Sequence, residues 1–255
     1  MKYINQTLLT VGLFLLIAQH SVFAKEQLTA VVEWAQRVDL TIPVEGIVKK
    51  VLVNTGQKVK KGQVLVELDK RIVLADLRQA KAALNAVRAN YEEVKRELER
   101  AQELYDRTVL SDHDLQVAKN NEVIAKSKLE QAKANYVKAQ VALEYASLRA
   151  PFDSIILHRA VEVGKAIIKL QAYDTLITLA SSNKYLAVAP LNQAQATSIA
   201  IGDKVSVLDN DNRYTGKVTA IEYMDANTTT AFRLVVEFGS DNHNLHAGSV
   251  VKVSF

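Results

Sequence analysis

The sequence predicts a mixed α+β fold that is elongated and multidomain. A β-sandwich is interrupted by an antiparallel coiled-coil hairpin of α-helices and is followed by a small β-barrel. Residues 41–69 and 148–181 carry the alternating apolar residues of half-buried strands. The 77 residues between them, Lys70 to Ala146, contain no glycine and no proline, and their apolar positions follow a seven-residue repeat. Residues 182–255 return to strand patterning.

Residues 1–24 have the layout of a secretory signal. Lys2 precedes an apolar run from Leu8 to Ile17, and Val22 and Ala24 are the small residues of a cleavage site. An uncleaved membrane anchor is the alternative, but this run is short for a span of roughly 20 apolar residues. We therefore expect export and a mature chain that begins after Ala24. The chain has no cysteine, which excludes disulfides, thiolate metal sites and lipid attachment at cysteine.

The first half of the sandwich is predicted over residues 41–69. Gly46, Gly56 and Gly62 stand at expected turns between short apolar strands. The preceding residues 25–40 are too few for a domain. Their VVEW stretch predicts a strand that joins either the barrel or the sandwich, and the sequence leaves both possibilities open.

The hairpin is predicted over residues 70–147. Its first helix has a seam of apolar residues spaced as in a coiled coil: Leu77, Ala80, Leu84, Val87, Tyr91, Val94, Leu98, Ala101 and Tyr105. The second helix has the matching seam of Leu115, Ala118, Ala125, Leu129, Ala132, Tyr136, Ala139, Leu143 and Ala146, interrupted only by Glu122. Small alanines opposite larger residues allow two antiparallel helices to approach closely.

The chain reverses between these helices near residues 107–112. Ser111 with Asp114 three residues later is the pattern of a capping box, which begins a helix. The alternative is one continuous helix of about 75 residues in a dimeric coiled coil. A capping box near the midpoint argues against that alternative, so the sequence favours a hairpin whose tip is the reversal.

Pro151 ends the second helix, and residues 148–181 complete the sandwich. In residues 182–255 five strand-like segments and a short helix from Asn192 to Ala200, ended by Gly202, predict a small barrel.

Most chemistry is excluded or disfavoured by the sequence. The formal charge of +4 is spread along the chain, without the basic and aromatic cluster of a nucleic-acid site. His243 and His246 lie in a loop-like stretch, and Asp209 and Asp211 lack the glycine and distal glutamate of a calcium loop. No nucleophile elbow or phosphate-binding loop occurs. We expect no cofactor, no metal and no catalytic site.

Two segments resemble a known family. Gly46-Ile47-Val48, Gly56, Val59, Gly62-Gln63 and Leu68-Asp69 look like the first half of a lipoyl-like domain, and Arg149–Asp153 looks like the start of its second half. With the hairpin between them, this order resembles the periplasmic adaptor (membrane fusion protein, HlyD-like) family of resistance-nodulation-division (RND) efflux pumps. Ser154 replaces the glycine usual in the family, and the second half lacks a later glycine near residues 169–172. The chain ends at Phe255, so we expect the family's membrane-proximal domain to be short or missing.

The tip carries the sharpest part of this resemblance. Arg100, Leu104 and Ser111 keep the spacing of Arg, three residues, Leu, six residues and Ser that is found in adaptors that dock on TolC-like outer-membrane channels. The resemblance implies that these three residues contact the channel. Each also has a structural explanation, since Ser111 can cap a helix and Leu104 can cover the end of the seam.

The resemblance also implies partners and a location. We expect a periplasmic protein held at the inner membrane by its partners: an RND-type transporter, a TolC-like channel and further copies of itself in a ring, with a hexamer as the family expectation. Lys70 is at the place of the lysine that lipoyl carrier domains modify. We expect it unmodified, because the hairpin replaces the tight turn. Alternatives are an adaptor for an ABC-type exporter and a periplasmic protein that binds a metal or a hydrophobic ligand.

Overall fold

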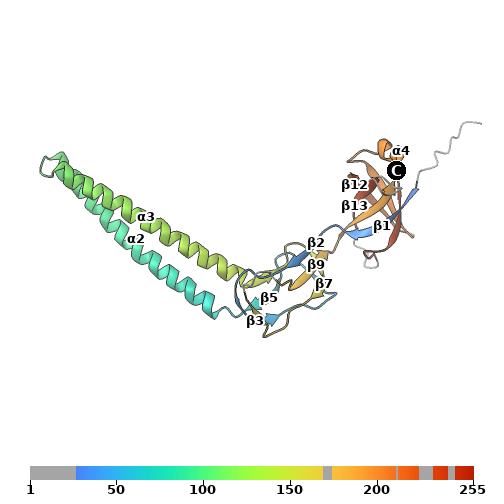
Figure 1. Ribbon diagram of the computed structural model, residues 1–255, viewed down its shortest axis with the longest axis horizontal. Coiled ribbons are helices and arrows are strands. Elements are labelled where there is room, and N and C mark those ends of the chain that lie inside the picture. The colour runs from blue at the N-terminus through green and yellow to red at the C-terminus, as the bar shows by residue number, and fades with distance from the viewer. Residues whose placement is uncertain (1–26, 169–173, 211, 224–231, 241–244) are drawn as a thin grey trace, which may run out of the picture. The chain divides into compact units, whose positions relative to one another are not determined.

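A computed structural model describes residues 27–168, 174–210, 212–223, 232–240 and 245–255. The predicted signal, residues 1–24, lies outside the described residues. The chain divides into two compact units (Figure 1). One unit is Gln36–Asn183, which contains the hairpin and the sandwich, and the other combines Lys184–Phe255 with the chain before Gln36.

The sandwich is built from strands on both sides of the hairpin. In chain order these are β2 (Arg37–Leu40), β3 (Gly46–Val51), β4 (Lys58–Val59), β5 (Val64–Leu68), β6 (Ser147–Arg149), β7 (Ser154–Arg159), β8 (Ala166–Ile167) and β9 (Ile177–Ser181). They form two four-stranded sheets, ordered β2-β9-β7-β4 and β6-β5-β3-β8. Leu65, Ile156 and Leu179 share one fully buried core, although the hairpin separates Leu65 from the other two in sequence. The predicted interrupted sandwich is therefore confirmed.

The two segments that carry the family resemblance bind each other directly. The Gly62 amide donates to the Ala150 carbonyl at 2.8 Å. The Asp153 carboxylate accepts a 2.8 Å bond from the Lys61 amide and a 3.0 Å bond from the Lys60 ammonium. The Lys61 amide, and then Lys60, hold the pKa of Asp153 below its ordinary value. These contacts join the two halves of the sandwich, which the inserted hairpin separates in sequence.

Two of the three expected turn glycines adopt left-handed conformations. Gly56 and Gly62 both have φ of +80°, a region that glycine enters without strain. Gly46 instead opens strand β3, so its prediction as a turn residue was wrong. A Cβ atom there would lie 3.2 Å from Leu68 Cδ1, which indicates that close packing, rather than a turn, selects glycine. Ser154 begins β7 and its hydroxyl donates to the Phe152 carbonyl at 2.7 Å.

The hairpin consists of α2 (Arg71–Asp106) and α3 (Asp112–Tyr145). Strand β5 leads into α2 and β6 follows α3, and these strands are hydrogen-bonded neighbours. Both ends of the hairpin therefore enter one sheet side by side. Lys70 is the N-cap residue of α2 and forms a 3.1 Å ion pair with Glu67. At about 1.5 Å per residue, the 36 residues of α2 extend roughly 54 Å.

The predicted seam is the contact surface of the two helices. Leu84, Leu129 and Ala132 form its buried cluster, with Val87, Tyr91 and Tyr136 packed around them. Two terminal members differ from the prediction. Tyr105 is 37% exposed because α2 ends one residue later, and Ala146 is the C-cap of α3 and belongs to the sandwich core.

The seam interruption at Glu122 has a partner across the interface. The Tyr91 hydroxyl donates to Glu122 Oε1 at 3.1 Å, and both side chains are half-buried. This hydrogen bond, with some burial, raises the pKa of Tyr91 above its ordinary value. A polar pair within an apolar seam fixes the alignment of the two helices, because sliding one helix would leave both groups unpaired.

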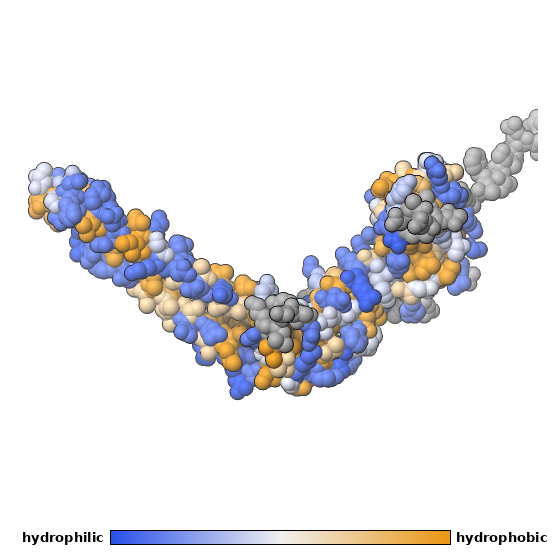
Figure 2. All heavy atoms as spheres, viewed as in Figure 1, coloured by the Kyte–Doolittle hydropathy of each residue, from blue (hydrophilic) through white to orange (hydrophobic). Residues whose placement is uncertain are grey.

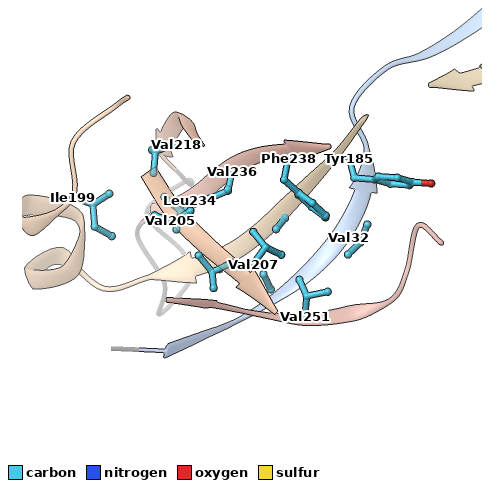
Figure 3. Packing of buried hydrophobic residues seen from close by; sticks show 14 of the residues in the cluster. Val32, Tyr185, Ile199, Val205, Val207, Val218, Leu234, Val236, Phe238 and Val251 are labelled. Carbon is cyan, nitrogen blue, oxygen red and sulfur yellow. The ribbon is translucent and has the colours of Figure 1, made fainter. Parts of the chain in front are cut away.

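The second unit is a closed six-stranded barrel. Its strands are β1 (Gln27–Trp34), β10 (Lys184–Leu191), β11 (Lys204–Asp209), β12 (Asn212–Tyr223), β13 (Phe232–Gly239) and β14 (Val250–Ser254), in the order β1-β10-β13-β12-β11-β14. The short helix α4 (Gln193–Ser198) follows β10. Strand β1 comes from the N-terminal segment and closes the barrel between β10 and β14. Val32, Leu234 and Phe238 lie in a continuous apolar core (Figure 3).

The described residues also bear on membrane and metal sites. Among them, no helix combines the length and the apolar character needed to cross a bilayer. They contain no group of three or more His, Cys, Asp or Glu side chains arranged for a metal ion. His243 and Asp211 lie outside the described residues. Asp209 pairs with Asn212, so β11 and β12 are antiparallel neighbours up to this point.

Candidate docking site at the hairpin tip

The reversal between α2 and α3 is a tight turn without glycine. Thr108 adopts the left-handed conformation with φ of 57°. The Thr108 amide donates to the Tyr105 carbonyl at 2.8 Å and the Val109 amide donates to the Leu104 carbonyl at 2.9 Å. These bonds satisfy carbonyls that the helix end would leave unpaired. The turn therefore has a defined backbone on which side chains can be presented.

Ser111 begins α3 as its N-cap. Its hydroxyl oxygen accepts from the Asp114 amide at 3.2 Å and donates to the Asp114 carboxylate at 2.6 Å. Asp112 and Asp114 lie in the first helical turn, where negative charge is favourable to the helix dipole. Because the Ser111 hydroxyl is used both as donor and as acceptor within the tip, its main effect is to fix where α3 starts.

Arg100 is held by a weak ion pair on its own helix. Its Nη2 atom lies 3.4 Å from Glu93 Oε1, and its side chain is 64% exposed. Glu93 also bonds Arg96, and that hydrogen bond is the main cause that lowers the pKa of Glu93, with Arg100 contributing less. An exposed ion pair of this kind contributes little to stability, because solvent screens the two charges. Arg100 can therefore leave Glu93 for a carboxylate or carbonyl of a partner at little cost.

The end of the hairpin also exposes apolar side chains. Leu104 is 42% exposed and Val109 is 71% exposed. Hydrophobic atoms at the end of the hairpin are visible in Figure 2. Leu104 lies one turn beyond Arg100 on α2, and Val109 follows at the reversal itself. The tip thus presents an apolar surface next to an available guanidinium, which together suit a groove between helices of another protein.

Val109 is the residue that sequence reasoning missed. The reversal was located from Ser111 and Asp114, but its apolar members were not considered as contacts. An apolar residue within a five-residue connection between helices is a usable signal, because few neighbouring residues are available to bury it. The three predicted residues all lie exposed, close to the reversal, and their contact with a channel stays a prediction.

Comparison with known proteins identifies the family. The model of the CzcB-like, barrel-sandwich hybrid domain matches residues 36–181, which is more than half of the chain and nearly the whole first unit. The chain belongs to this family. The match covers the sandwich with its inserted hairpin, so it confirms the resemblance that the two lipoyl-like segments indicated.

Relatives of this CzcB-like protein include named export and resistance proteins. The macrolide export protein MacA of Yersinia pestis is 27% identical over 215 residues, which cover 78% of this chain and 57% of the relative. The cobalt-zinc-cadmium resistance protein CzcB of Cupriavidus metallidurans is 25% identical over 173 residues, which cover 64% of this chain and 31% of the relative. The chain thus spans less than two thirds of the length of these relatives.

Solved structures show the same fold. A chimera of MacA with the α-hairpin domain of Pseudomonas aeruginosa MexA has a TM-score of 0.62 at 22% identity, and the similarity covers 90% of this chain and 80% of the chimera. The membrane fusion protein Spr0693 of Streptococcus pneumoniae has a TM-score of 0.63 at 18% identity, covering 89% of this chain and 97% of the other. The predicted combination of sandwich, hairpin and barrel is therefore an established architecture.

Proposed function

We propose that this CzcB-like protein is the periplasmic adaptor of a tripartite efflux pump. It joins an inner-membrane RND-type transporter to a TolC-like outer-membrane channel for the export of small molecules. The observation that carries the proposal is the long hairpin, with helices of 36 and 34 residues, ending in an exposed tip that presents Arg100, Leu104 and Val109. Relatives named for macrolide export and for cobalt-zinc-cadmium resistance support an export function.

The tip acts by contact rather than by chemistry. Leu104 and Val109 enter apolar notches of the channel, and Arg100 exchanges Glu93 for acceptors of the channel. A fully buried Leu or Val side chain contributes about 1.5–3 kcal/mol, so one tip alone binds weakly. Several copies arranged in a ring, with a hexamer as the expected number, bind together with much greater strength. Ser111 keeps α3 in the position that these contacts need.

The remaining parts of the chain serve the inner-membrane side. The barrel and the sandwich contact the transporter, and the secretory signal places the protein in the periplasm. The partner can be of the RND type or, as the second possibility in the same class, an ABC-type exporter. The two relatives carry names for macrolide export and for cobalt-zinc-cadmium resistance, which support export but do not select the substrate of this chain.

Affinity purification after cross-linking in cells tests this function. A tagged chain is compared with the double variant Leu104→Asp and Val109→Asp, both at exposed positions where the fold tolerates charge. The parent chain is expected to bring down a transporter and an outer-membrane channel, and the variant only the transporter. The class of the recovered transporter, RND or ABC, identifies the partner.

Other results would contradict the adaptor function. Recovery of neither partner from cells shown to produce a channel would overturn it. A metal or hydrophobic molecule bound at one per chain in the purified protein, without a channel, would support a periplasmic ligand-binding protein instead.

A further inference from the structure

The outer face of the barrel carries a pocket that the tip contact does not use. It has a volume of about 620 Å³ and lies over β10, β11, β12 and β13, next to the loop before β11. Its lining includes three lysines, one glutamate, one exposed threonine and a glycine of the loop: Lys184, Lys204, Lys217, Glu237, Thr215 and Gly202. Three lysines against one glutamate leave the pocket with two positive charges in excess.

Two of the lysines point outward from neighbouring strands. Lys204 and Lys217 are exposed, while the adjacent residues Val205 and Val218 are buried in the barrel core (Figure 3). In the antiparallel register Lys204 of β11 lies directly opposite Lys217 of β12. Like charges at directly opposite positions destabilise a sheet. The barrel fold by itself therefore gives no reason for this pair of lysines.

The carboxylate nearest to them in the register is already paired. Glu237 of β13 lies opposite Lys217, but its Oε1 atom accepts a 3.0 Å hydrogen bond from the Lys184 ammonium. Within the described part of the chain, neither Lys204 nor Lys217 forms an ion pair. Two exposed ammonium groups therefore remain side by side to bind an anion from outside the chain.

The loop beside the lysines is fixed to β12 by backbone hydrogen bonds. The Gly202 amide donates to the Val218 carbonyl at 2.9 Å, and the Val218 amide donates to the Asp203 carbonyl at 2.9 Å. The Asp203 carboxylate accepts a 2.8 Å bond from the Ala200 amide, so it serves the loop itself. Gly202 has φ of +103°, and a Cβ atom there would lie 3.9 Å from Lys217 Cε. The Lys217 side chain thus lies along a backbone edge of defined position.

A hydroxyl group and a β-bulge complete the pocket. Thr215 is exposed on β12 two residues before Lys217, so both side chains leave the same face of the strand. The pairing of β12 with β13 shifts register between Val218 and Ala220, and Thr219 at this bulge also lines the pocket. β-bulges are common next to functional sites, where they change the direction of side chains. Thr215 adds a hydroxyl donor beside the two ammonium groups.

We propose that this pocket binds a phosphate monoester. Lysine is a common ligand of phosphate, and each ammonium offers three N–H donors to the phosphate oxygens. A phosphate monoester carries about −1.5 to −2 charges near pH 7, which matches the two positive charges in excess. A single carboxylate would neutralise only one of the two lysines. The monoester belongs either to a lipid headgroup at the membrane or to a small molecule in solution.

Binding of two probes to the purified full chain tests the site. Glycerol 3-phosphate is titrated in a calorimeter, and vesicles of phosphatidylcholine with and without phosphatidic acid are sedimented with the chain. The test variant is Lys204→Gln with Lys217→Gln. The control is Arg213→Gln with Lys252→Gln, which removes two charges at exposed barrel residues outside the pocket. All chains are compared at one ionic strength, so that general attraction to a basic barrel is the same for both variants.

The test variant is expected to bind at least about tenfold more weakly than the parent, because two charge-assisted contacts are lost, and the control about as well as the parent. Binding of phosphatidic acid vesicles without glycerol 3-phosphate would assign the monoester to a lipid headgroup, and the reverse result to a soluble molecule. No binding of either probe, or an equal loss in both variants, would overturn the proposal. Equal affinity for acetate and glycerol 3-phosphate would also overturn it.

The stability of the barrel gives a second measurement, followed by the fluorescence of Trp34, which packs against the barrel core. Lys217→Gln is expected to raise the melting temperature at low salt, and less at high salt, because it removes the repulsion by Lys204. Glycerol 3-phosphate or phosphatidic acid, whichever binds, is expected to raise the melting temperature of the parent but not of the test variant. An equal rise in both chains would overturn the proposal.

This inference goes beyond the proposed function, because an anion site on the barrel depends neither on a channel nor on a transporter. Channel capture from the tip is a separate readout. Failure of the phosphate site would therefore leave the adaptor function standing, and failure of channel capture would leave the phosphate site standing.

Discussion

The barrel and the hairpin hold themselves together in different ways. The barrel encloses a core in which Val32, Leu234 and Val236 are completely inaccessible to solvent, and its strands close on themselves. The hairpin has only a seam one side chain thick, with Leu84, Leu129 and Ala132 as its buried cluster. A closed barrel is complete as a single chain, whereas two long helices leave most of their surface to solvent or to partners. Most of the hairpin surface is therefore available for contact with other proteins.

The largest effect should come from the barrel core. Leu234→Ala is expected to destabilise the barrel by about 3 kcal/mol, because truncation of a fully buried leucine leaves a cavity. Trp34 is the only tryptophan and stacks on Tyr185 with ring centroids 5.5 Å apart, so its fluorescence reports barrel unfolding. Helical circular dichroism follows the hairpin. If Leu234→Ala lowered the melting temperature of the helical signal as much as that of the fluorescence signal, the barrel and the hairpin would not unfold independently.

A smaller loss is expected from the same truncation in the seam. Leu129 is 6% exposed, and Leu129→Ala should cost about 2 kcal/mol, at the low end for leucine, since a two-helix contact can collapse around the vacancy. Thermal unfolding followed by circular dichroism measures it. Ile124→Ala on the same helix, at a residue 53% exposed, is the matched control and should change little. A loss equal to that of Leu234→Ala would show that the seam is no weaker than the barrel core.

The polar pair within the seam should matter less again. Tyr91→Phe removes the hydrogen bond to half-buried Glu122 and is expected to cost about 1 kcal/mol. Adding Glu122→Leu should recover the loss, because it restores the apolar repeat. The folded-state pKa of Tyr91 is raised, so the pair stabilises the hairpin below about pH 10, the ordinary tyrosine pKa, and this contribution is lost as pH rises through the raised value. Parent and Tyr91→Phe chains should therefore lose their difference in melting temperature at strongly alkaline pH.

The cap at the tip should give the smallest change. Ser111→Ala is expected to destabilise the hairpin by about 0.5 kcal/mol, since the lost cap lies at an exposed helix end. Ser111→Asp retains a capping oxygen and should keep the stability of the parent. Comparison of Ser111→Ala with Ser111→Asp distinguishes the role of Ser111 as a helix cap from a role in binding the channel. If Ser111→Asp lost channel capture with unchanged melting temperature, Ser111 would contact the channel directly.

The hairpin was the part most open to prediction from sequence. The absence of glycine and proline predicts helix, and the seven-residue repeat predicts which faces of the two helices touch. Both signals depend only on residues that are near one another in the sequence. Ser111 and Asp114 located the turn for the same reason. The assignment of the VVEW stretch in residues 25–40, which became part of β1, was left open because alternation predicts a strand but not its neighbours. Those neighbours, Lys184–Leu191 and Val250–Ser254, lie more than 150 residues away.

The surfaces of the hairpin that can bind other proteins were predicted less completely than its helices. The spacing of Arg100, Leu104 and Ser111 pointed to the tip, whereas the exposure of Val109 depends on the conformation of the turn. A groove between α2 and α3 was missed, because Ala80, Ala132 and Ala139, which line it, were explained by helix contact alone. Only the fold shows that the same alanines also leave a hollow on one face of the hairpin.

Photo-crosslinking from the tip in living cells tests the central claim most directly. A photoreactive amino acid replaces Leu104 in one chain and Ala82, an exposed residue on the same helix far from the tip, in the control. The adaptor function predicts that an outer-membrane channel is trapped from position 104 and is absent from position 82. Equal capture from both positions, or no capture from position 104 in cells that contain channel and adaptor, would contradict it.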